Sequence, residues 1–220
     1  MALSNPSDRP YALDGLQSRI LNVLNSRGGF GVLDEGDSKK GLLRRSLLWH
    51  RGPGTQRLER IVFPAHRAIA LVPSWSWMAY TGGIDYFEIQ FGQVDWQDLQ
   101  SPWSGRGIGL GISQQATATP SEEKRGSIAL VAKVRGYDVS QALEGEWKLV
   151  FDTPGLPPPA TPLCVPLGRE KGSSVERTYL LLVQETDVID DDGSRIYERV
   201  GAGYLPARCV GKGVGRITIR

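Results

Sequence analysis

The chain has 220 residues, of which 40% are hydrophobic and 23% are charged. These values are typical of a globular protein and exclude a disordered chain, and the length suits one domain spanning residues 1–220. The net charge is only +2, with acidic and basic residues spread along the whole length, which argues against a nucleic-acid-binding protein with one basic face.

The cysteines and the N-terminal segment indicate a compartment. Cys164 and Cys209 cannot form a disulfide framework, so we expect buried free thiols in a reducing environment. The first ten residues are polar, and no apolar run approaches the length of a membrane span. The sequence therefore predicts a cytoplasmic protein that does not bind membranes.

The N-terminal part is predicted to be helical, over residues 11–49. In Tyr11–Arg27, apolar residues recur at three- and four-residue steps, namely Leu13, Leu16, Ile20 and Leu24, and Leu21 and Val23 widen this stripe. Gly28-Gly29 follows, where a helix end favours residues that tolerate positive φ. A second short helix is predicted over Ser38–Trp49, although Gly41 weakens it by roughly 1 kcal/mol relative to Ala.

From residue 68 to 220 the hydrophobic period changes to two, which predicts strands. The predicted strands are Ala68–Val72, Trp75–Tyr80, Ile84–Phe91, Ser127–Tyr137, Trp147–Asp152, Arg177–Thr186, Arg195–Leu205 and Val214–Ile219. Gly82-Gly83 indicates a hairpin between two of them, and the turn residues Asp190–Gly193 join two long strands. The predicted fold is therefore a mainly β, single antiparallel β-barrel or β-sandwich domain with one or two N-terminal helices packed against it.

Several ordered motifs resemble one known family. The run Val72–Tyr86 contains the segment Pro-Ser-Trp-Ser-Trp, and the other motifs are Asp8–Arg19, Gly28–Leu33, Arg45–Trp49, Tyr179–Val183 and Tyr197–Gly203. Together they resemble the region that follows the core of fungal heterokaryon-incompatibility (HET) proteins. The resemblance spans nearly the whole chain. It implies a fungal HET-associated β domain.

The HET core itself has no counterpart in this sequence. In HET proteins that core resembles Toll/interleukin-receptor domains and carries a strand motif centred on Leu-Trp-Val-Asp, which does not occur here. The chain begins with Met1 where the region after the core would begin. We therefore expect that this chain does not have the incompatibility activity of the family.

Tryptophans suggest either a dense core or an apolar pocket. Trp75 and Trp77 are two residues apart and would share one face of a strand, and Trp96 and Trp103 follow. Large indole rings fill cores, but they also line ligand sites. The pocket hypothesis assigns substrate binding to Trp75, Trp77, Tyr86, Phe87 and Trp103.

Three polar residues complete this hypothetical site, with catalytic roles assigned to Arg199, Tyr197 and Asp85. Asp85 falls among aromatic residues, where a carboxylate needs a partner, although it could instead cap the hairpin. Glu198 and Arg199 would face opposite sides of a strand, so one of them should point inward and pair with Asp85. A purely structural ion pair is the alternative.

No standard cofactor or metal motif is present. The glycine-rich run Gly105–Gly111 lacks the following helix that a dinucleotide site requires. The two histidines, His50 and His66, and the two cysteines have no zinc-ligand spacing, and no nucleophile elbow accompanies them. We therefore predict that the protein uses no cofactor and no metal.

Two functions remain open at this stage. The first is a small-molecule-binding β domain that acts as a cofactor-independent enzyme of fungal secondary metabolism, such as a cyclase, isomerase or pericyclase for an apolar intermediate. Such chemistry needs a shaped apolar cavity and a hydrogen-bond donor on a carbonyl. The second is a non-enzymatic HET-associated binding or regulatory module that acts through protein–protein interaction.

Overall fold

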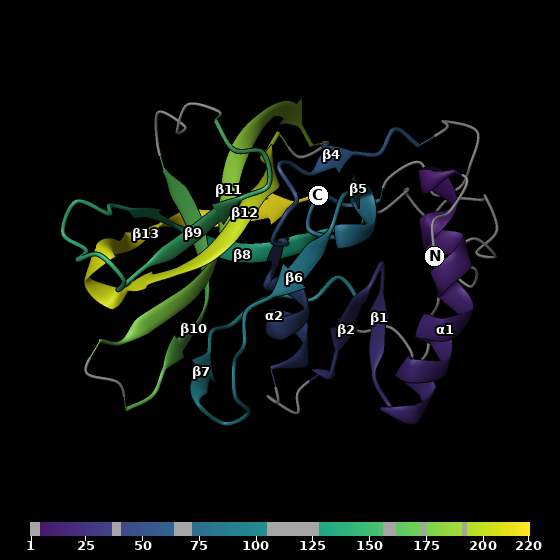
Figure 1. The fold of residues 1–220 in the computed structure, drawn as a ribbon, viewed down its shortest axis with the longest axis horizontal. Coiled ribbons are helices and arrows are strands. Elements are labelled where there is room, and N and C mark those ends of the chain that lie inside the picture. The colour runs from purple at the N-terminus through teal and green to yellow at the C-terminus, as the bar shows by residue number, and fades with distance from the viewer. Residues whose placement is uncertain are drawn as a thin grey trace.

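The computed structural model describes residues 5–36, 41–63, 72–104, 128–155, 162–172, 175–190 and 193–220. The C-terminal half forms a strand-rich body, and a smaller N-terminal part lies beside it (Figure 1). The outermost element of this N-terminal part is a helix. The fold is mainly β, because the described α-helices have only 15 and 6 residues. This confirms the predicted fold class.

Five long strands form the main body. They are β8 (Leu130–Tyr137), β10 (Leu163–Glu170), β11 (Arg177–Ile189), β12 (Arg195–Pro206) and β13 (Val210–Ile219). Their pairings form a closed cycle in the order β11–β10–β8–β13–β12 and back to β11. Two shorter strands extend the sheet: β9 (Lys148–Phe151) pairs with β12, and β7 (Val94–Trp96) pairs with β10.

Alternation along the strands gives the sheet a buried face that belongs to the main hydrophobic core. In β8, Leu130, Ala132 and Val134 are buried, whereas Lys133 between them is exposed. The buried side chains of β8 join those of β10, β11 and β13 in one hydrophobic cluster. The sequence period of two therefore sets which β8 side chains face the core and which face outward.

One pairing in the cycle is parallel rather than antiparallel. A 3₁₀ turn, η4 (Ala207–Cys209), separates β12 from β13, and β13 then pairs antiparallel with β8. The far end of β13 returns to the start of β12, where Ile196 lies opposite Thr218 and Tyr197 opposite Ile219. The structure thus departs here from the all-antiparallel sheet that the sequence predicts.

The turn predicted at Asp190–Gly193 is confirmed by its described ends. The amide of Asp190 donates to the carbonyl of Ser194 at 2.8 Å, and the amide of Gly193 donates to the carbonyl of Asp190 at 2.9 Å.

The two cysteines, Cys164 and Cys209, are both free and buried, as expected.

The N-terminal part consists of short elements. They are η1 (Pro6–Asp8), α1 (Arg9–Val23), β1 (Arg27–Gly29), β2 (Val32–Asp34), α2 (Leu42–Leu47), β3 (Trp49–Arg51), β4 (Glu59–Arg60), η3 (Trp77–Ala79), β5 (Tyr80–Thr81) and β6 (Ile84–Tyr86). β1 pairs with β2, β3 with β6, and β4 with β5. Only Val72 of the predicted strand Ala68–Val72 lies within the described residues.

The strand predicted over Trp75–Tyr80 is wrong. The segment forms a turn and then η3. The Ser76 hydroxyl accepts from the amide of Met78 at 3.1 Å and donates to the carbonyl of Phe30 at 2.6 Å. These side-chain hydrogen bonds replace the backbone pairing that a strand would need. The Gly82-Gly83 hairpin is also wrong, since β5 pairs with β4 and β6 pairs with β3. Trp75 and Trp77 therefore do not share a strand face.

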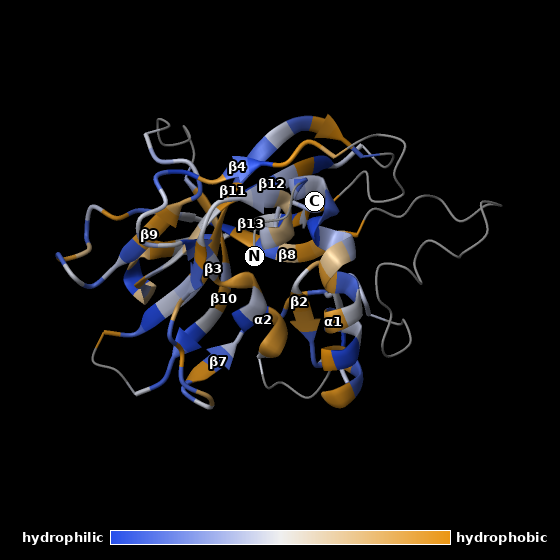
Figure 2. Cartoon of the chain, turned by 45° about the vertical axis from the view of Figure 1, so that its right-hand side comes forward, coloured by the Kyte–Doolittle hydropathy of each residue, from blue (hydrophilic) through white to orange (hydrophobic). Residues whose placement is uncertain are grey.

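Helix α1 packs through only part of the predicted apolar stripe. Leu21 is buried and Leu13 packs against the core, whereas Leu16, Ile20, Val23 and Leu24 are exposed. The polar Gln17 is buried as well. Figure 2 shows hydrophobic segments along this outer helix. The buried Gln17 fastens the helix to the β1–β2 turn, because its side chain donates to the carbonyl of Val32 at 3.3 Å and accepts from the amide of Gly31 at 3.2 Å.

The end of α1 depends on Asn25. The helix stops at Val23 rather than at the predicted Arg27, and Asn25 adopts a left-handed conformation with φ of 49°. The amide of Ser26 donates to the carbonyl of Leu21 at 2.9 Å and the amide of Asn25 to that of Asn22 at 3.2 Å. This is the Schellman arrangement, in which glycine and asparagine are favoured.

We expect Asn25→Ala to lower the free energy of unfolding by about 1 kcal/mol, because an alanine Cβ is strained in this conformation. Asn25→Gly should equal or exceed the parent, since glycine adopts positive φ without that strain. Urea unfolding of the three proteins measures the difference. Equal stability of the alanine and glycine variants would contradict this account of the helix end.

Candidate functional site

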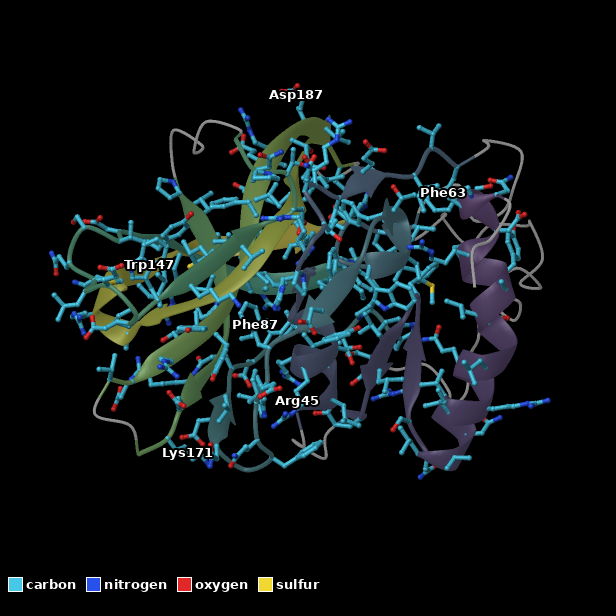
Figure 3. All side chains as sticks on the ribbon, in the orientation of Figure 1. Arg45, Phe63, Phe87, Trp147, Lys171 and Asp187 are labelled. Carbon is cyan, nitrogen blue, oxygen red and sulfur yellow. The ribbon has the colours of Figure 1, made fainter. Side chains whose placement is uncertain are left out.

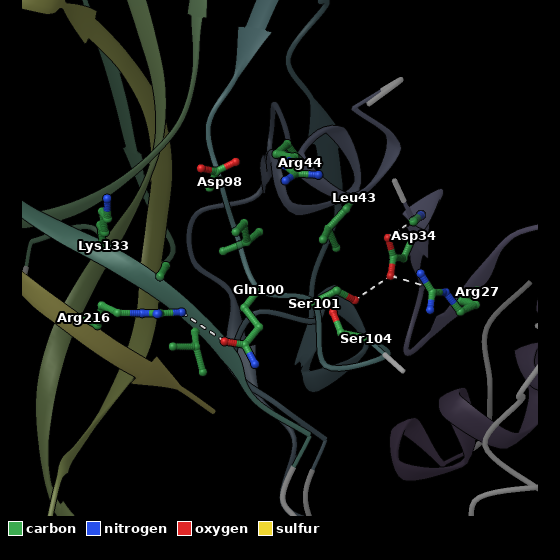
Figure 4. A pocket seen from close by; sticks show the side chains of 14 residues that line it. Arg27, Asp34, Leu43, Arg44, Asp98, Gln100, Ser101, Ser104, Lys133 and Arg216 are labelled. Carbon is green, nitrogen blue, oxygen red and sulfur yellow. Dashed lines mark hydrogen bonds and ion pairs between the residues drawn. The ribbon is translucent and has the colours of Figure 1, made fainter. Parts of the chain in front are cut away.

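A polar cleft lies where the N-terminal part meets strands β8 and β13, and Figure 4 shows it from close by. Its volume is about 490 Å³, within the range of sites for small molecules. The lining side chains are mostly polar or charged, with a few apolar ones: Arg27, Asp34, Leu43, Arg44, Asp98, Leu99, Gln100, Ser101, Ser104, Val131, Ala132, Lys133 and Arg216, together with Gly36.

One side of the cleft is a rigid hydrogen-bonded network around Asp34. This carboxylate is 2% exposed, and it accepts from the hydroxyl of Ser101 at 2.6 Å and from the amide of Gly36 at 2.9 Å. Arg27 lies 4.0 Å away and also donates to the carbonyl of Trp103 at 3.1 Å. The hydroxyl of Ser101 accepts from the amide of Trp103 at 3.1 Å as well. Both Asp34 and Ser101 are thus occupied in holding the fold, so Ser101 is not placed as a nucleophile.

Arg44 is likewise held by neighbours. Its Nε donates to the carbonyl of Gln97 at 3.2 Å, and its guanidinium lies 3.9 Å from Glu35. Glu35 in turn accepts from the amides of Gly41 and Leu43 at 2.5 and 2.8 Å, at the start of α2. These contacts fix the position of the cation, while Glu35 offsets part of its charge.

Lys133 and Arg216 form the opposite side of the cleft. They lie directly across from each other in the β8–β13 register, and both are exposed. Arg216 donates to the side-chain oxygen of Gln100 at 3.0 Å, and Gln100 is itself anchored to β8 by two backbone hydrogen bonds with Val131. Neither cation forms an ion pair within the part of the chain that the structure describes.

This pairing of like charges is unfavourable in isolation. Two like charges directly opposite each other on antiparallel strands destabilise a sheet by roughly 0.2–1 kcal/mol. Asp34 lies beside Arg27, and Glu35 lies beside Arg44, whereas no carboxylate lies within ion-pair distance of Lys133 or Arg216 among the described residues. Uncompensated positive charge therefore gathers at the β8–β13 side of the cleft.

A second polar cluster is fully buried and surrounds Arg199. The Arg199 guanidinium donates to Asp152 at 2.7 Å and to the carbonyl of Trp49 at 2.5 Å, and it stacks 3.2 Å from the centre of the Trp49 ring. The backbone amide of Arg199 donates to the hydroxyl of Ser74 at 3.0 Å. Burial raises the pKa of Asp152, and the charge of Arg199 opposes that rise.

The predicted Arg199–Asp85 pair is therefore wrong, because the partner of Arg199 is Asp152. Asp85 is exposed on β6, opposite His50, and accepts from the amide of its neighbour Tyr86 at 2.8 Å. The expectation that either Glu198 or Arg199 points inward is confirmed, and the buried one is Arg199. A register shift in the β11–β12 pairing falls next to it.

Trp75 and Trp103 fill space in the core. They are 0% and 1% exposed and meet edge to face with ring centroids 5.9 Å apart. Phe30 packs on the other side of Trp75 at 6.4 Å. Trp77 is half-buried, and its Nε1 donates to the carbonyl of Gly31 at 3.3 Å.

The remaining predicted site residues lie elsewhere. Phe87 lies between the N-terminal part and the main sheet (Figure 3), 4.4 Å from the His50 ring and 6.0 Å from the Tyr204 ring. Tyr86 is exposed, and the half-buried Tyr197 donates to Glu185 at 3.3 Å. None of the eight predicted site residues lines the cleft.

The structure contains no group of three or more His, Cys, Asp or Glu side chains placed to hold a metal ion, within the described ranges. His66 and Gly105–Gly111 lie outside those ranges. Among the described helices, none is long and apolar enough to cross a membrane.

Comparison with protein-family models, with curated proteins and with solved structures gives no match. The resemblance to the HET region therefore remains a prediction from the motifs.

Proposed function

We propose that this chain is a small-molecule-binding β domain whose ligand is a small polar anion bound in the cleft. The observation that carries the proposal is the pair Lys133 and Arg216, two exposed cations on adjacent strands without a carboxylate partner among the described residues. An anion bound between them removes their mutual repulsion. Arg27 and Arg44 lie on the other side of the cleft, where Asp34 and Glu35 offset part of their charge.

The character of the lining supports a polar ligand over an apolar intermediate. Leu43, Leu99, Val131 and Ala132 supply only patches of apolar surface between charged groups. The cyclase, isomerase or pericyclase prediction needs an apolar cavity instead, and the tryptophans assigned to that cavity pack in the core or against the β1–β2 turn. The hydroxyl of Ser101 donates to Asp34 and accepts from the amide of Trp103. Because both hydrogen bonds hold the fold, a binding role for the cleft is favoured over nucleophilic catalysis by Ser101.

The alternative of a protein-binding module has one observation in its favour. Helix α1 exposes the apolar residues Leu16, Ile20, Val23 and Leu24. Exposed apolar patches often mark interaction surfaces. A bound small anion does not exclude this role, since a ligand can regulate a binding module.

We expect citrate and inorganic phosphate, tested separately by calorimetry, to bind the full chain in the cleft, and Arg216→Gln to weaken that binding about tenfold or more. A hydrogen bond between charged groups contributes about 1.5–3 kcal/mol, and about 1.4 kcal/mol corresponds to tenfold in affinity. Lys212→Gln is the matched control, because Lys212 is an exposed cation of β13 that does not line the cleft. Equal weakening by both substitutions, or no binding of either anion, would contradict the proposal.

A further inference from the structure

Resting on the proposed function, we infer that the ligand is a phosphomonoester of a polyhydroxy compound, with its phosphate held between Lys133 and Arg216. Four features favour this ligand: the charge of the pair, the volume of the cleft, its hydrogen-bonding groups and the lack of aromatic rings among its described lining residues.

The two cations match a dianionic group. Cross-strand neighbours have Cβ atoms roughly 5 Å apart, so both side chains can reach the same small anion. A phosphomonoester carries about −1.5 to −2 charges at neutral pH, and it therefore neutralises both cations, whereas a carboxylate neutralises one. The guanidinium of Arg216 can offer two parallel donors to phosphate oxygens, and the ammonium of Lys133 acts as a point charge.

Gln100 positions one of these two cations. Its backbone is bonded to Val131 on β8, and its side-chain oxygen accepts from Arg216 at 3.0 Å. Figure 4 shows the Arg216 side chain extended across the cleft toward Gln100. The guanidinium is thereby held over the cleft before any ligand arrives, which lowers the entropy lost on binding.

The rest of the cleft suits hydroxyl groups. About 490 Å³ is more than one phosphate needs, which leaves room for further ligand atoms. Asp98 and Ser104 are exposed residues of the lining, and the carboxylate of Asp98 has no ion-pair partner in the described part of the chain. Carboxylates accept hydrogen bonds from hydroxyls. A sugar-like polyol therefore fits the remaining space of the cleft.

The lining disfavours a nucleotide. None of the described residues that line the cleft is aromatic, so none of them offers a ring to stack on a base. Such stacking contributes roughly 1–3 kcal/mol per base in proteins that bind single-stranded nucleic acids. The predicted ligand is consequently a sugar phosphate rather than a nucleoside phosphate.

The test is calorimetric titration of the full chain with glucose 6-phosphate, glucuronate, glucose and adenosine monophosphate. We expect glucose 6-phosphate to bind at least about tenfold more tightly than glucuronate, and glucose to give no measurable binding. Lys133→Gln and Arg216→Gln should each weaken glucose 6-phosphate about tenfold, and Lys212→Gln should not. Asp98→Asn should weaken glucose 6-phosphate severalfold while leaving inorganic phosphate unchanged. Circular dichroism checks that each variant is folded. Broadening of the ³¹P line of the ligand gives a second measure of binding.

The outcomes separate this inference from the proposed function. If glucuronate or citrate binds as tightly as glucose 6-phosphate and depends on Arg216, the phosphate assignment is overturned and the anion cleft stands. If adenosine monophosphate binds more tightly than glucose 6-phosphate, the sugar assignment is overturned. If no anion binds, both the inference and the proposed function fail.

Discussion

Replacing Arg199 by Met is expected to lower the free energy of unfolding by about 3–5 kcal/mol. The substitution removes the cation from Asp152, whose residue is only 4% exposed, and it also removes the donor to the carbonyl of Trp49. Leaving a buried carboxylate without its partner is more costly than losing an exposed pair. Urea unfolding followed by circular dichroism measures the loss.

A matched control is the exposed pair Arg57–Glu59, in which Arg57→Met should change stability by less than about 1 kcal/mol.

The stability lost in Arg199→Met should also depend on pH. Burial already raises the pKa of Asp152, and removing the opposing cation raises it further. A carboxyl with a raised pKa in the folded state favours folding at low pH and loses that contribution as the pH rises. The deficit should therefore be larger at pH 7 than at pH 5, and a deficit independent of pH, or below about 1 kcal/mol, would contradict the burial of an ionised pair.

Trp75→Ala is expected to lower the free energy of unfolding by about 3–5 kcal/mol, because the buried indole packs between Phe30 and Trp103 and its removal leaves a cavity. The same substitution at Trp147, which is 37% exposed, should cost far less. This comparison separates the loss of a buried core indole from the loss of an exposed one. Trp75→Ala with near-parental stability and lost ligand binding would favour the original pocket hypothesis.

The sequence predicts four of the five long strands, β8, β11, β12 and β13, because they are long and alternate. It does not predict β10, since Pro166 and Gly168 interrupt its strand pattern. Leu130, Ala132 and Val134 alone indicate which face of β8 is buried. The N-terminal part is predicted less well, because its strands have two or three residues and are fixed by contacts between distant segments. The predicted strand at Trp75–Tyr80 fails for this reason, since the side chain of Ser76 bonds the backbone of Met78 and of Phe30.

Helix α1 shows a related limit. Apolar spacing predicts a buried stripe that includes Leu16, Ile20 and Leu21, but of these only Leu21 is buried, together with the polar Gln17. Gln17 satisfies two backbone groups of the β1–β2 turn, and no hydrophobic pattern encodes that pairing. Secondary structure was thus predictable here, and orientation was not.

The cleft was not predictable from one sequence. Its opposing sides come from Asp34 and Ser101 on one side and Lys133 and Arg216 on the other, residues far apart in the chain. Each of these residues is ordinary by itself. The like-charged pair becomes visible only once the β8–β13 register places Lys133 opposite Arg216.

The central claim, an anion bound in this cleft, is tested most directly by ¹H–¹⁵N correlation spectra of the full chain during separate titrations with citrate and inorganic phosphate. We predict saturable shifts concentrated at the amides of residues 98–104, 131–133 and 215–217, with smaller changes near Asp34. Absence of saturable shifts in both titrations, or shifts concentrated around Trp77, Phe87 and Tyr197, would contradict the claim.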